Sequence, residues 1–429
     1  MKIAIIGSGA IGCLYGAYLS RNNEVYMLCR RQKVVDSINK DGLTVFEADG
    51  GEEKFPNVQA CLSGECEAEI DLVLVIVKSM DTLSAMEANR NILRENTMVM
   101  TLQNGGGNDR KLAQFVSMER VIIGTTRHNS VNLDNGNVRH SGSGPTYIGS
   151  NDKRTNLAEV AKVFEEAGLE TIVSDNIQRI IWSKLFFNLS INTFTAITKS
   201  PFGFAIENDY AWSFVEKLIC EAIEVAEAEG QHFSCLEILS SVHKTCESVS
   251  TGFSSMSQDV MNCRKTEIDS INGFVVERAS VHNVPTPYNT FVINLIHSIE
   301  GTYKEQVKPQ IKYGAGEVIL KQGEKNPHLY IIMQGNVSIF TDYGKGNEYL
   351  IGVGSQGKCF GEYSCFSGNP STYSVVADED TIVMEIPRTD IHNFISINPK
   401  NAEEIFGSMA KQIALLSKHI EMLKNEKGK

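Results

Sequence analysis

The sequence has no excess of basic residues and no long apolar run. Its 40 lysines and arginines are outnumbered by 52 aspartates and glutamates, so the net charge is −12. This charge argues against a protein that wraps nucleic acid, because neutralising the phosphates needs a basic face. No apolar run reaches the ~18–20 residues of a membrane span, and glycines interrupt the apolar N-terminus too soon for a signal peptide. We therefore expect neither a nucleic-acid nor a membrane partner.

The ten cysteines include no CxxC pair. Ten scattered thiols in 429 residues do not form a disulfide scaffold, which favours a reducing, cytoplasmic location, and we expect no metal site. Hydrophobic residues make up 42% of the chain and charged residues 21%, which are ordinary globular values. A chain of this length predicts about two to four domains.

Strand-like apolar runs alternate with helical stretches in the first third of the chain. The predicted strands are Lys2–Ile6, Glu24–Cys29, Ile70–Val77 and Thr97–Leu102, and the predicted helices are Ile11–Ser20 and Asp81–Leu93. This alternation is typical of βαβ units in a doubly wound parallel sheet, so we predict an α/β domain over residues 1–175. The glycine-rich segment Gly136–Ile148 is expected to form a hairpin at the far edge of the sheet.

The pattern changes twice further along the chain. Between residues 176 and 305, apolar residues recur at helical spacing, which predicts an all-helical domain. The expected helices are Ile177–Ile197, Tyr210–Glu229, Leu236–Val249, Thr266–His282 and Asn289–Tyr303. From residue 306 to residue 400, short β-like runs separated by glycines predict a small β-barrel of the jelly-roll type.

The last segment, residues 401–429, is predicted to be a C-terminal helix. Apolar residues recur in it at spacings of four and three: Ile405, Met409, Ile413, Leu416, Ile420 and Leu423. Such a stripe suits pairing with a partner helix, and we expect a homodimer. The alternative is that the stripe packs on the chain's own barrel.

A GxGxxG motif, Gly7-Ser8-Gly9-Ala10-Ile11-Gly12, connects the first predicted strand to the first predicted helix. In this context the first glycine permits a tight turn, the second lets the backbone approach a pyrophosphate, and the third allows the helix to pack close to the strand. The free N–H groups and the positive end of the helix then hold the phosphates. The motif predicts a Rossmann-type dinucleotide site; the alternative is a glycine-rich turn without a ligand.

The second predicted strand ends in Cys29-Arg30-Arg31. NAD sites usually present an acidic residue here, which holds the ribose 2′-hydroxyl, whereas a guanidinium pairs with the additional 2′-phosphate of NADP. We therefore predict NADPH as the cofactor, with Arg30 as the partner of its 2′-phosphate and Arg31 as the next candidate. The alternative is a pair of solvated surface arginines.

A row of polar residues follows one face of the predicted helix that contains WSKLFFNLSIN. Lys184, Asn188 and Asn192 are four residues apart, so they share one face. The rest of this helix is apolar and carries little charge, so the row indicates a site rather than a solvated stripe. Glu267, in the segment TEIDSING, would by itself be interpreted as a surface or capping carboxylate.

Five motifs occur in an order and spacing that resemble the ketopantoate reductase family, the 2-dehydropantoate 2-reductases. They are GSGAIG, Leu102-Gln103-Asn104-Gly105, WSKLFFN, SSMSQD and TEIDSING, and the similarity covers about residues 1–303. The resemblance implies a Rossmann domain, an all-helical domain and a cleft between them. In this family NADPH delivers a hydride to the ketone of a branched 2-oxo acid, which gives pantoate for coenzyme A synthesis.

The resemblance also implies roles for individual residues. Lys184 corresponds to the general acid that protonates the nascent alkoxide, and Glu267 to a carboxylate that binds the substrate hydroxyl and helps to position the lysine. The other candidates are Ser255 for the substrate carboxylate, Asn104, Asn188 and Asn192 as amides that line the cleft, and Lys78, with Asn104 again, beside the cofactor.

Two positions depart from the family pattern. Gly252 and Phe202 stand where family members often carry asparagine, so two polar substrate contacts are expected to be missing and an aromatic ring to take one of their places. A site that bonds a hydroxyl discriminates strongly only where those partners exist. The reaction type is therefore expected to hold, whereas the identity of the 2-oxo acid stays open.

Residues 313–377 resemble a cyclic-nucleotide-binding domain. The segment FGEYSCFSGNPSTYSVVA (360–377) aligns with the phosphate-binding cassette, which implies that Glu362 would hold a ribose 2′-hydroxyl and that N–H groups near Gly361 would face the phosphate. Ser371 stands where the cassette has an arginine, and losing that charged hydrogen bond, worth about 1.5–3 kcal/mol, weakens binding roughly tenfold to a hundredfold. We expect a weak or altered nucleotide ligand, or a barrel kept for dimerisation or regulation.

The sequence thus predicts NADPH-dependent reduction of a small branched 2-oxo acid, in the first place 2-dehydropantoate, by a chain with an appended barrel. Two alternatives stay open. One is a non-catalytic NADP(H) sensor that signals through the barrel, and the other is a reductase of a different 2-oxo acid.

Overall fold

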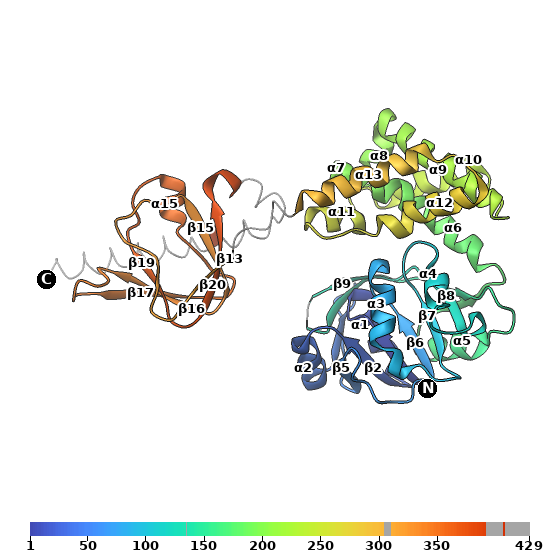
Figure 1. Cartoon of the computed structure of the whole chain (residues 1–429), viewed down its shortest axis with the longest axis horizontal. Coiled ribbons are helices and arrows are strands. Elements are labelled where there is room, and N and C mark those ends of the chain that lie inside the picture. Colours follow the sequence, from blue (N-terminus) through green and yellow to red (C-terminus); the bar gives the residue numbers. More distant parts are fainter. Residues whose placement is uncertain (134, 304–309, 392–405, 408–429) are drawn as a thin grey trace. The chain divides into compact units, whose positions relative to one another are not determined.

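The protein is described by a computed structural model for residues 1–133, 135–303, 310–391 and 406–407. The chain forms two compact units (Figure 1): the first comprises Met1–Val260 and Lys265–Ser298, and the second comprises Met261–Arg264 and Ile299–Lys429. The predicted fold class is confirmed, because an α/β region and a helical region precede a small antiparallel β-barrel.

An eight-stranded sheet, in the order β12-β11-β8-β7-β6-β1-β2-β5, forms the centre of the first unit. Its strands are β1 (Lys2–Ile6), β2 (Glu24–Cys29), β5 (Val58–Leu62), β6 (Leu72–Val75), β7 (Met98–Thr101), β8 (Val121–Thr126), β11 (Thr146–Gly149) and β12 (Thr171–Val173). The strands from β8 to β5 are parallel, and every residue of β6 is buried, as expected of a central parallel strand. The predicted strands β1 and β2 are confirmed with the same bounds, whereas β6 and β7 are shorter than predicted.

Helix α1 (Ala10–Leu19) packs between this sheet and a second sheet of four strands. The second sheet consists, in spatial order, of β4 (Glu52–Phe55), β3 (Leu43–Phe46), β10 (Asn137–Gly142) and β9 (Asn129–Asn132). Every residue of α1 from Gly12 to Leu19 is buried, because the helix contacts strands of both sheets. A helix that is buried all round needs no polar face, which explains why α1 carries no charged residue.

Four further helices, together with short 3₁₀ turns, complete the α/β region in the described residues. They are α2 (Gln32–Asp41), α3 (Thr82–Ala88), α4 (Asn108–Leu112) and α5 (Leu157–Glu166). The single helix predicted over Asp81–Leu93 is instead α3 flanked by two 3₁₀ turns, Ser79–Asp81 and Arg90–Ile92.

The hairpin predicted over Gly136–Ile148 is wrong. Strand β10 pairs with β3 and β9 in the smaller sheet, whereas β11 pairs with β8 and β12 in the larger one. The chain therefore passes from one sheet to the other within this segment. Strand β10 pairs with the preceding strand β9 and with the more distant β3, so the local alternation of residues could not show that β10 and β11 join different sheets.

Helices α6 to α13 follow in the chain (Figure 1). Their bounds are α6 (Ile177–Phe187), α7 (Thr193–Thr198), α8 (Phe204–Glu207), α9 (Asp209–Ala228), α10 (Cys235–Ser248), α11 (Ser255–Met261), α12 (Ile268–His282) and α13 (Pro287–Gly301). The long helix predicted over Ile177–Ile197 is α6 and α7 joined by a π-helical turn, Asn188–Asn192. The buried Glu221 of α9 accepts hydrogen bonds from the N–H groups of Tyr288 and Asn289, since the first N–H groups of a helix such as α13 have no partner within the helix.

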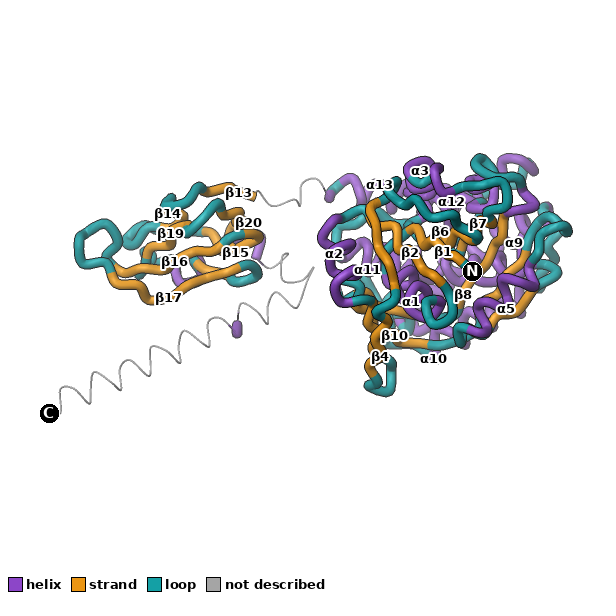
Figure 2. Tube along the Cα trace, turned by 90° about the horizontal axis from the view of Figure 1, so that it is seen from below, coloured by secondary structure: helices purple, strands orange, loops and turns teal. Residues whose placement is uncertain are grey.

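The second unit contains two four-stranded antiparallel sheets (Figure 2), in the orders β13-β20-β15-β18 and β14-β19-β16-β17. Its elements are β13 (Gln310–Tyr313), β14 (Val318–Leu320), β15 (His328–Gln334), β16 (Asn336–Thr341), β17 (Tyr349–Ser355), β18 (Cys359–Phe360), α15 (Glu362–Ser367), β19 (Ser374–Ala377) and β20 (Thr381–Pro387). Buried apolar side chains from both sheets, among them Ile332, Val337, Val375 and Val383, form one core.

The predicted C-terminal helix over residues 401–429 lies outside the described residues, apart from Phe406 and Gly407. Its apolar stripe and the homodimer therefore stay predictions. In the described part of the chain, no helix combines the length and the apolar character that crossing a membrane requires.

Candidate active site

The turns after β1 and β6 meet at the carboxyl edge of the large sheet. These strands are neighbours in the sheet although they are distant in the sequence, so the strand order reverses between them. Ligands of doubly wound sheets bind at such a switch point. The Gly7–Gly12 turn follows β1, and Lys78 follows β6, so both predicted cofactor segments lie at the expected edge.

Gly7 and Gly12 must be glycine because of close contacts within the protein, independently of any ligand. Gly7 has a φ of +121°, and a Cβ there would lie 2.9 Å from the carbonyl carbon of Ile76. A Cβ at Gly12 would lie 1.9 Å from the carbonyl oxygen of Gly7. Both contacts are with backbone, which cannot move aside as a flexible side chain can. These two glycines therefore shape the turn whether or not a ligand is bound.

Gly9 has no such structural reason to be glycine. Its φ of −79° and ψ of −176° suit any residue, and a Cβ there would meet no heavy atom of the described residues within 4 Å. Gly9 precedes α1, whose first N–H groups receive no side-chain cap from it. Open space beside N–H groups at a helix start fits a phosphate. The partly buried Ser8, Ala10 and Ile11 complete the turn, so the residues present fit the predicted dinucleotide.

Arg30 lies at the end of β2, next to β1 in the sheet. Its side chain is 75% exposed, and its guanidinium lies 3.1 Å from Asp81 Oδ2. An exposed ion pair of this kind contributes little stability, roughly 0–1 kcal/mol, so it would give way readily to a phosphate. Arg31 is also exposed and precedes α2.

Helix α6 brings the ammonium group of Lys184 to the end of β8. Its Nζ donates a hydrogen bond to the carbonyl oxygen of Thr126 at 3.1 Å. Burial lowers the pKa of Lys184 from 10.5 to about 8, and the Arg127 guanidinium adds to this effect, whereas the Glu267 carboxylate opposes it. An ammonium with a pKa near the working pH is well matched to donating a proton.

Thr126 is held in place by buried hydroxyl groups. Tyr15, from α1, donates a hydrogen bond to Thr126 Oγ1 at 2.8 Å, and the same phenol lies 2.5 Å from Thr146 Oγ1. The N–H of His128 also donates to Thr126 Oγ1, at 3.0 Å. The residue that accepts the Lys184 hydrogen bond is thus tied to the helix that begins at the glycine turn.

Asn188 and Asn192 lie in the π-helical turn between α6 and α7. The side-chain amide of Asn192 donates to Asn188 Oδ1 at 3.0 Å, and both side chains are buried. In the part of the chain that the structure describes, no hydrogen bond joins Lys184 to either amide. Beyond the turn, Thr193 donates to Asn272 Oδ1 at 2.8 Å. π-helical turns are rare and occur frequently at functional sites.

Glu267 and Lys78 connect the helical region to the sheet region. Glu267 Oε1 accepts a hydrogen bond from the N–H of Ser79 at 2.9 Å. Lys78 Nζ lies 2.6 Å from Asp259 Oδ1 and donates to the carbonyl oxygen of Lys265 at 3.1 Å. The structure therefore places Glu267 at the carboxyl edge of the sheet, rather than on a solvated surface.

Asn104 belongs to the loop after β7, and this loop lies against the start of α12. The carbonyl oxygen of Asn104 accepts a hydrogen bond from the side chain of Asn108 at 3.2 Å. The N–H of Gly106 donates to the carbonyl oxygen of Ser270 at 2.9 Å, three residues beyond Glu267. Asn104 and Glu267 therefore lie on two segments that are in contact with each other.

The two adjacent serines at the start of α11 have different environments. Ser254 is buried, accepts a hydrogen bond from the N–H of Ser257 at 2.9 Å and lies 2.9 Å from Thr195 Oγ1. Ser255 is the first residue of α11 and is exposed. Ser254 therefore caps the helix, while Ser255 is accessible to a ligand.

The two departures from the family pattern contact each other. The N–H of Phe202 donates to the carbonyl oxygen of Gly252 at 2.9 Å, and a Cβ at Gly252 would lie 3.1 Å from the Phe202 ring. The Phe202 ring also packs edge-on against Phe187, with 5.7 Å between centroids. The ring and the glycine are thus complementary in shape, because a side chain at Gly252 would press on the Phe202 ring.

Sequence reasoning missed several of these residues. Thr126 contributes a backbone carbonyl, which every residue type supplies, so no sequence signal marks it. Tyr15 acts from a helix that the sequence presents only as apolar. Asp259 lies inside the SSMSQD motif, and its charge could have suggested a partner for Lys78.

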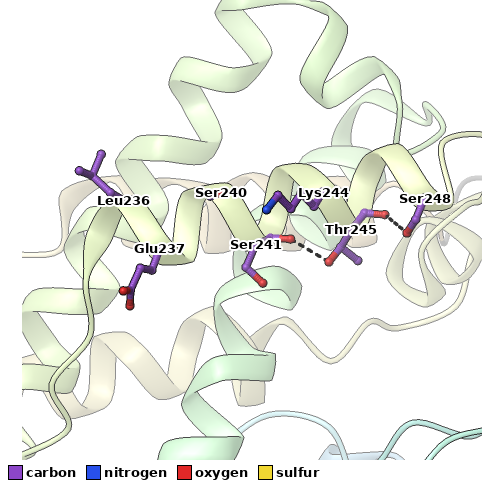
Figure 3. A pocket seen from close by; sticks show the side chains of 7 residues that line it. All are labelled: Leu236, Glu237, Ser240, Ser241, Lys244, Thr245 and Ser248. Atoms are coloured by element: carbon purple, nitrogen blue, oxygen red, sulfur yellow. Dashed lines mark hydrogen bonds between the residues drawn. The ribbon is translucent and has the colours of Figure 1, made fainter.

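A surface pocket lies along α10 (Figure 3). It is lined by Leu236, Glu237, Ser240, Ser241, Lys244, Thr245 and Ser248. The hydroxyl groups of Thr245 and Ser248 donate to the carbonyl oxygens of Ser241 and Thr245 in the same helix. Both hydroxyl groups are thus bonded to the backbone of their own helix, and none of the predicted site residues lines this pocket, so it is not the candidate active site.

Segments of this chain match models of two protein families. Residues 3–153 match the family described as Ketopantoate reductase PanE/ApbA, and residues 176–300 match Ketopantoate reductase PanE/ApbA C terminal. Residues 310–398 match the Cyclic nucleotide-binding domain. The two reductase matches thus precede the segment that carries the barrel.

Individual proteins show the same similarity. The chain is 34% identical over 301 residues to a 2-dehydropantoate 2-reductase of Halobacterium salinarum (69% of this chain and 98% of that protein). It is 35% identical over 304 residues to one of Pyrococcus horikoshii (70% and 98%). Among solved structures, a ternary complex of D-mandelate dehydrogenase with NADH and anilino(oxo)acetate has a TM-score of 0.67 at 29% identity (71% of this chain and 100% of that chain). A PanE/ApbA family ketopantoate reductase from Ralstonia eutropha has a TM-score of 0.65 at 30% identity, with the same coverage.

Proposed function

Since this chain belongs to the ketopantoate reductase family, we propose that it reduces 2-dehydropantoate to pantoate with NADPH. The Lys184 ammonium at the end of β8 is the observation that carries the proposal, because its lowered pKa suits a proton donor. The open space at Gly9 and the exposed Arg30 support the choice of cofactor. In this proposal residues 1–175 form the cofactor domain and residues 176–305 the substrate domain.

The proposed chemistry needs one acid and a set of orienting groups. When bound, the cofactor supplies a hydride to the carbonyl carbon of the substrate. Lys184 holds a proton at Nζ and gives it to the carbonyl oxygen as negative charge develops there; the neutral amine then regains a proton from solvent. Glu267 stabilises the charged form of Lys184 and binds the substrate hydroxyl.

The other candidates orient the substrate and the cofactor. Ser255 hydrogen-bonds the substrate carboxylate, since it is exposed at the start of α11. The amides of Asn104, Asn188 and Asn192 line the cleft, and Lys78 with Asn104 contacts the cofactor. To contact the cofactor, Lys78 must give up its ion pair with Asp259.

Turnover by the full chain tests the proposal. We expect NADPH absorbance to fall when 2-dehydropantoate is added and pantoate to accumulate in equal amount. Failure to turn over any branched 2-oxo acid with either NADPH or NADH would contradict the proposal.

A 2-oxo acid with an entirely apolar side chain is the second candidate substrate. The contact between Phe202 and Gly252 favours it, because a ring and a glycine replace two amides and cannot bond a substrate hydroxyl. The same assay with 3-methyl-2-oxobutanoate, which lacks the hydroxymethyl group, separates the two. A higher kcat/KM for this compound than for 2-dehydropantoate would assign the apolar substrate.

The pH dependence of the reaction is expected to follow the titration of Lys184. The charged form is the acid, and its pKa in the free protein is about 8. With rising pH the ammonium loses its proton, so kcat/KM should be constant below pH 8 and fall about tenfold per pH unit above it. The measurement is kcat/KM for the 2-oxo acid with NADPH across this range. A falling limb only near the ordinary lysine value of about 10.4 would contradict the assignment.

Arg30→Ala is expected to weaken NADPH selectively. Losing a hydrogen-bonded pair with phosphate should raise KM for NADPH roughly tenfold to a hundredfold and leave KM for NADH unchanged. Arg31→Ala, at the neighbouring exposed arginine, is the matched control and should change both values little. Equal losses with both cofactors, or a larger effect of Arg31→Ala, would show that Arg30 does not hold the 2′-phosphate.

A further inference from the structure

The interior of the nucleotide cassette in the barrel is filled by one of its own side chains. The phenol of Tyr373, one residue before β19, accepts a hydrogen bond from the N–H of Gly361 at 3.0 Å. The same hydroxyl donates to Glu362 Oε2 at 3.3 Å. Tyr373 is 7% exposed and Glu362 is 2% exposed, and the Tyr373 ring belongs to the apolar core of the barrel.

These two partners are the groups on which the cassette resemblance depends. The resemblance implies that N–H groups near Gly361 face a phosphate and that Glu362 holds a ribose hydroxyl. In this chain the phenol bonds both. Burial and the nearby Glu362 raise the pKa of Tyr373 well above its ordinary value, so the phenol keeps its proton and remains a donor to the carboxylate.

Ser371, which stands where the cassette has an arginine, is buried and bonded to the neighbouring backbone. Ser371 is 4% exposed, and its hydroxyl donates to the carbonyl oxygen of Tyr373 at 2.7 Å. Its backbone N–H donates to the carbonyl oxygen of Glu324 at 2.9 Å. Arg388 lies near the other end of α15, where a Cβ on Gly368 would be 3.7 Å from its guanidinium. A cyclic phosphodiester in the cassette would thus lie near the negatively charged Glu362 carboxylate. The arginine that normally balances the negative charge of the phosphodiester would be missing.

We propose that Tyr373 closes the cassette of its own barrel in place of a nucleotide, so that the barrel takes neither cyclic AMP nor cyclic GMP. The hydroxyl makes the hydrogen bonds that a ribose phosphate would make, and the ring occupies the space. The ligand could enter only by expelling a buried aromatic ring from the core. The barrel is therefore held in one state, and cyclic nucleotides do not regulate the reductase segment. This inference does not depend on the proposed reaction.

Calorimetry on the full chain tests the inference. We expect no saturable heat when cyclic AMP or cyclic GMP is added at millimolar concentration. Saturable binding of either nucleotide to the unmodified chain would overturn the proposal.

A gain of binding gives the complementary test. The double variant S371R/Y373A opens the ring's space and restores the cation, and it should bind cyclic AMP at least tenfold more tightly than the unmodified chain, since one charged hydrogen bond accounts for about that factor. Tyr373→Phe keeps the ring and removes only the hydroxyl, so it should remain closed. A double variant that unfolds with the same cooperativity as the parent and still binds no better would overturn the proposal, as would tight binding by Tyr373→Phe.

Discussion

Replacing Lys184 with alanine is expected to lower kcat for 2-dehydropantoate by about 10³-fold or more, because general acid catalysis alone contributes roughly 10²–10⁴-fold and the ammonium also stabilises the developing oxyanion. The affinity for NADPH should change little, since Lys184 contacts the end of β8 rather than the Gly7–Gly12 turn. Steady-state kinetics with 2-dehydropantoate and fluorescence titration with NADPH measure the two effects separately.

The matched control for this variant is Ser183→Ala. Ser183 is exposed on the same helix, and its hydroxyl donates to the backbone carbonyl oxygen of Arg179, so its loss should leave kcat unchanged. Lys184→Arg keeps the charge but binds its proton too tightly to be an effective acid, and should remain slow. A Lys184→Ala protein with most of its activity would favour the alternative of a cofactor sensor, or a reductase that uses another acid.

Alanine at Gly12 should lower the stability of the protein, whereas alanine at Gly9 should lower its affinity for NADPH and leave the stability unchanged. At Gly12 the new Cβ would lie 1.9 Å from the Gly7 carbonyl oxygen. Overpacking of this kind costs about 1–3 kcal/mol and occasionally more, and here the rigid backbone contact places the loss at or above that upper value. At Gly9 the Cβ meets no heavy atom of the described residues within 4 Å, so stability should be preserved. NADPH affinity should nevertheless fall at least about tenfold, because backbone approach to the pyrophosphate is blocked.

Thermal unfolding and NADPH titration of the two variants form the test. Because both substitutions add the same methyl group three residues apart, each variant controls for the other. Gly9→Ala protein that binds NADPH as well as the parent would show that the cofactor does not approach this turn. A Gly12→Ala protein of parental stability would contradict the steric argument.

The parts of the fold that depend on local sequence could be predicted, and the parts that depend on distant pairing could not. The strand Lys2–Ile6 and the glycine turn were predictable because the apolar run, the glycines and the following helix are contiguous. The hairpin predicted over Gly136–Ile148 failed because β10 pairs with β9 and the distant β3 in one sheet, whereas β11 pairs with β8 and β12 in the other. Its alternating residues indicate strands without indicating which sheet each one joins.

In the candidate site too, some residues could be predicted from the local sequence and others could not. Lys184, Asn188 and Asn192 stood out because polar residues on an apolar helix are conspicuous, and Glu267 became a candidate only through the family resemblance. The Thr126 carbonyl and its support from Tyr15 have no signature, because one is backbone and the other lies in an ordinary buried helix. In the barrel, the sequence shows that Ser371 replaces an arginine, but only the structure shows that Tyr373 bonds Gly361 and Glu362.

The π-helical turn at Asn188–Asn192 has a consequence for how homologues of this chain tolerate length changes. Deleting one residue there would restore the regular helix of 3.6 residues per turn and rotate everything beyond it by about 100°. Thr193 and Thr195 would then turn away from Asn272 and Ser254, their present hydrogen-bond partners. A one-residue gap at this point in a homologue therefore signals rebuilt contacts with the segments that carry Ser254 and Asn272, whereas a gap of the same size in a surface loop would change little.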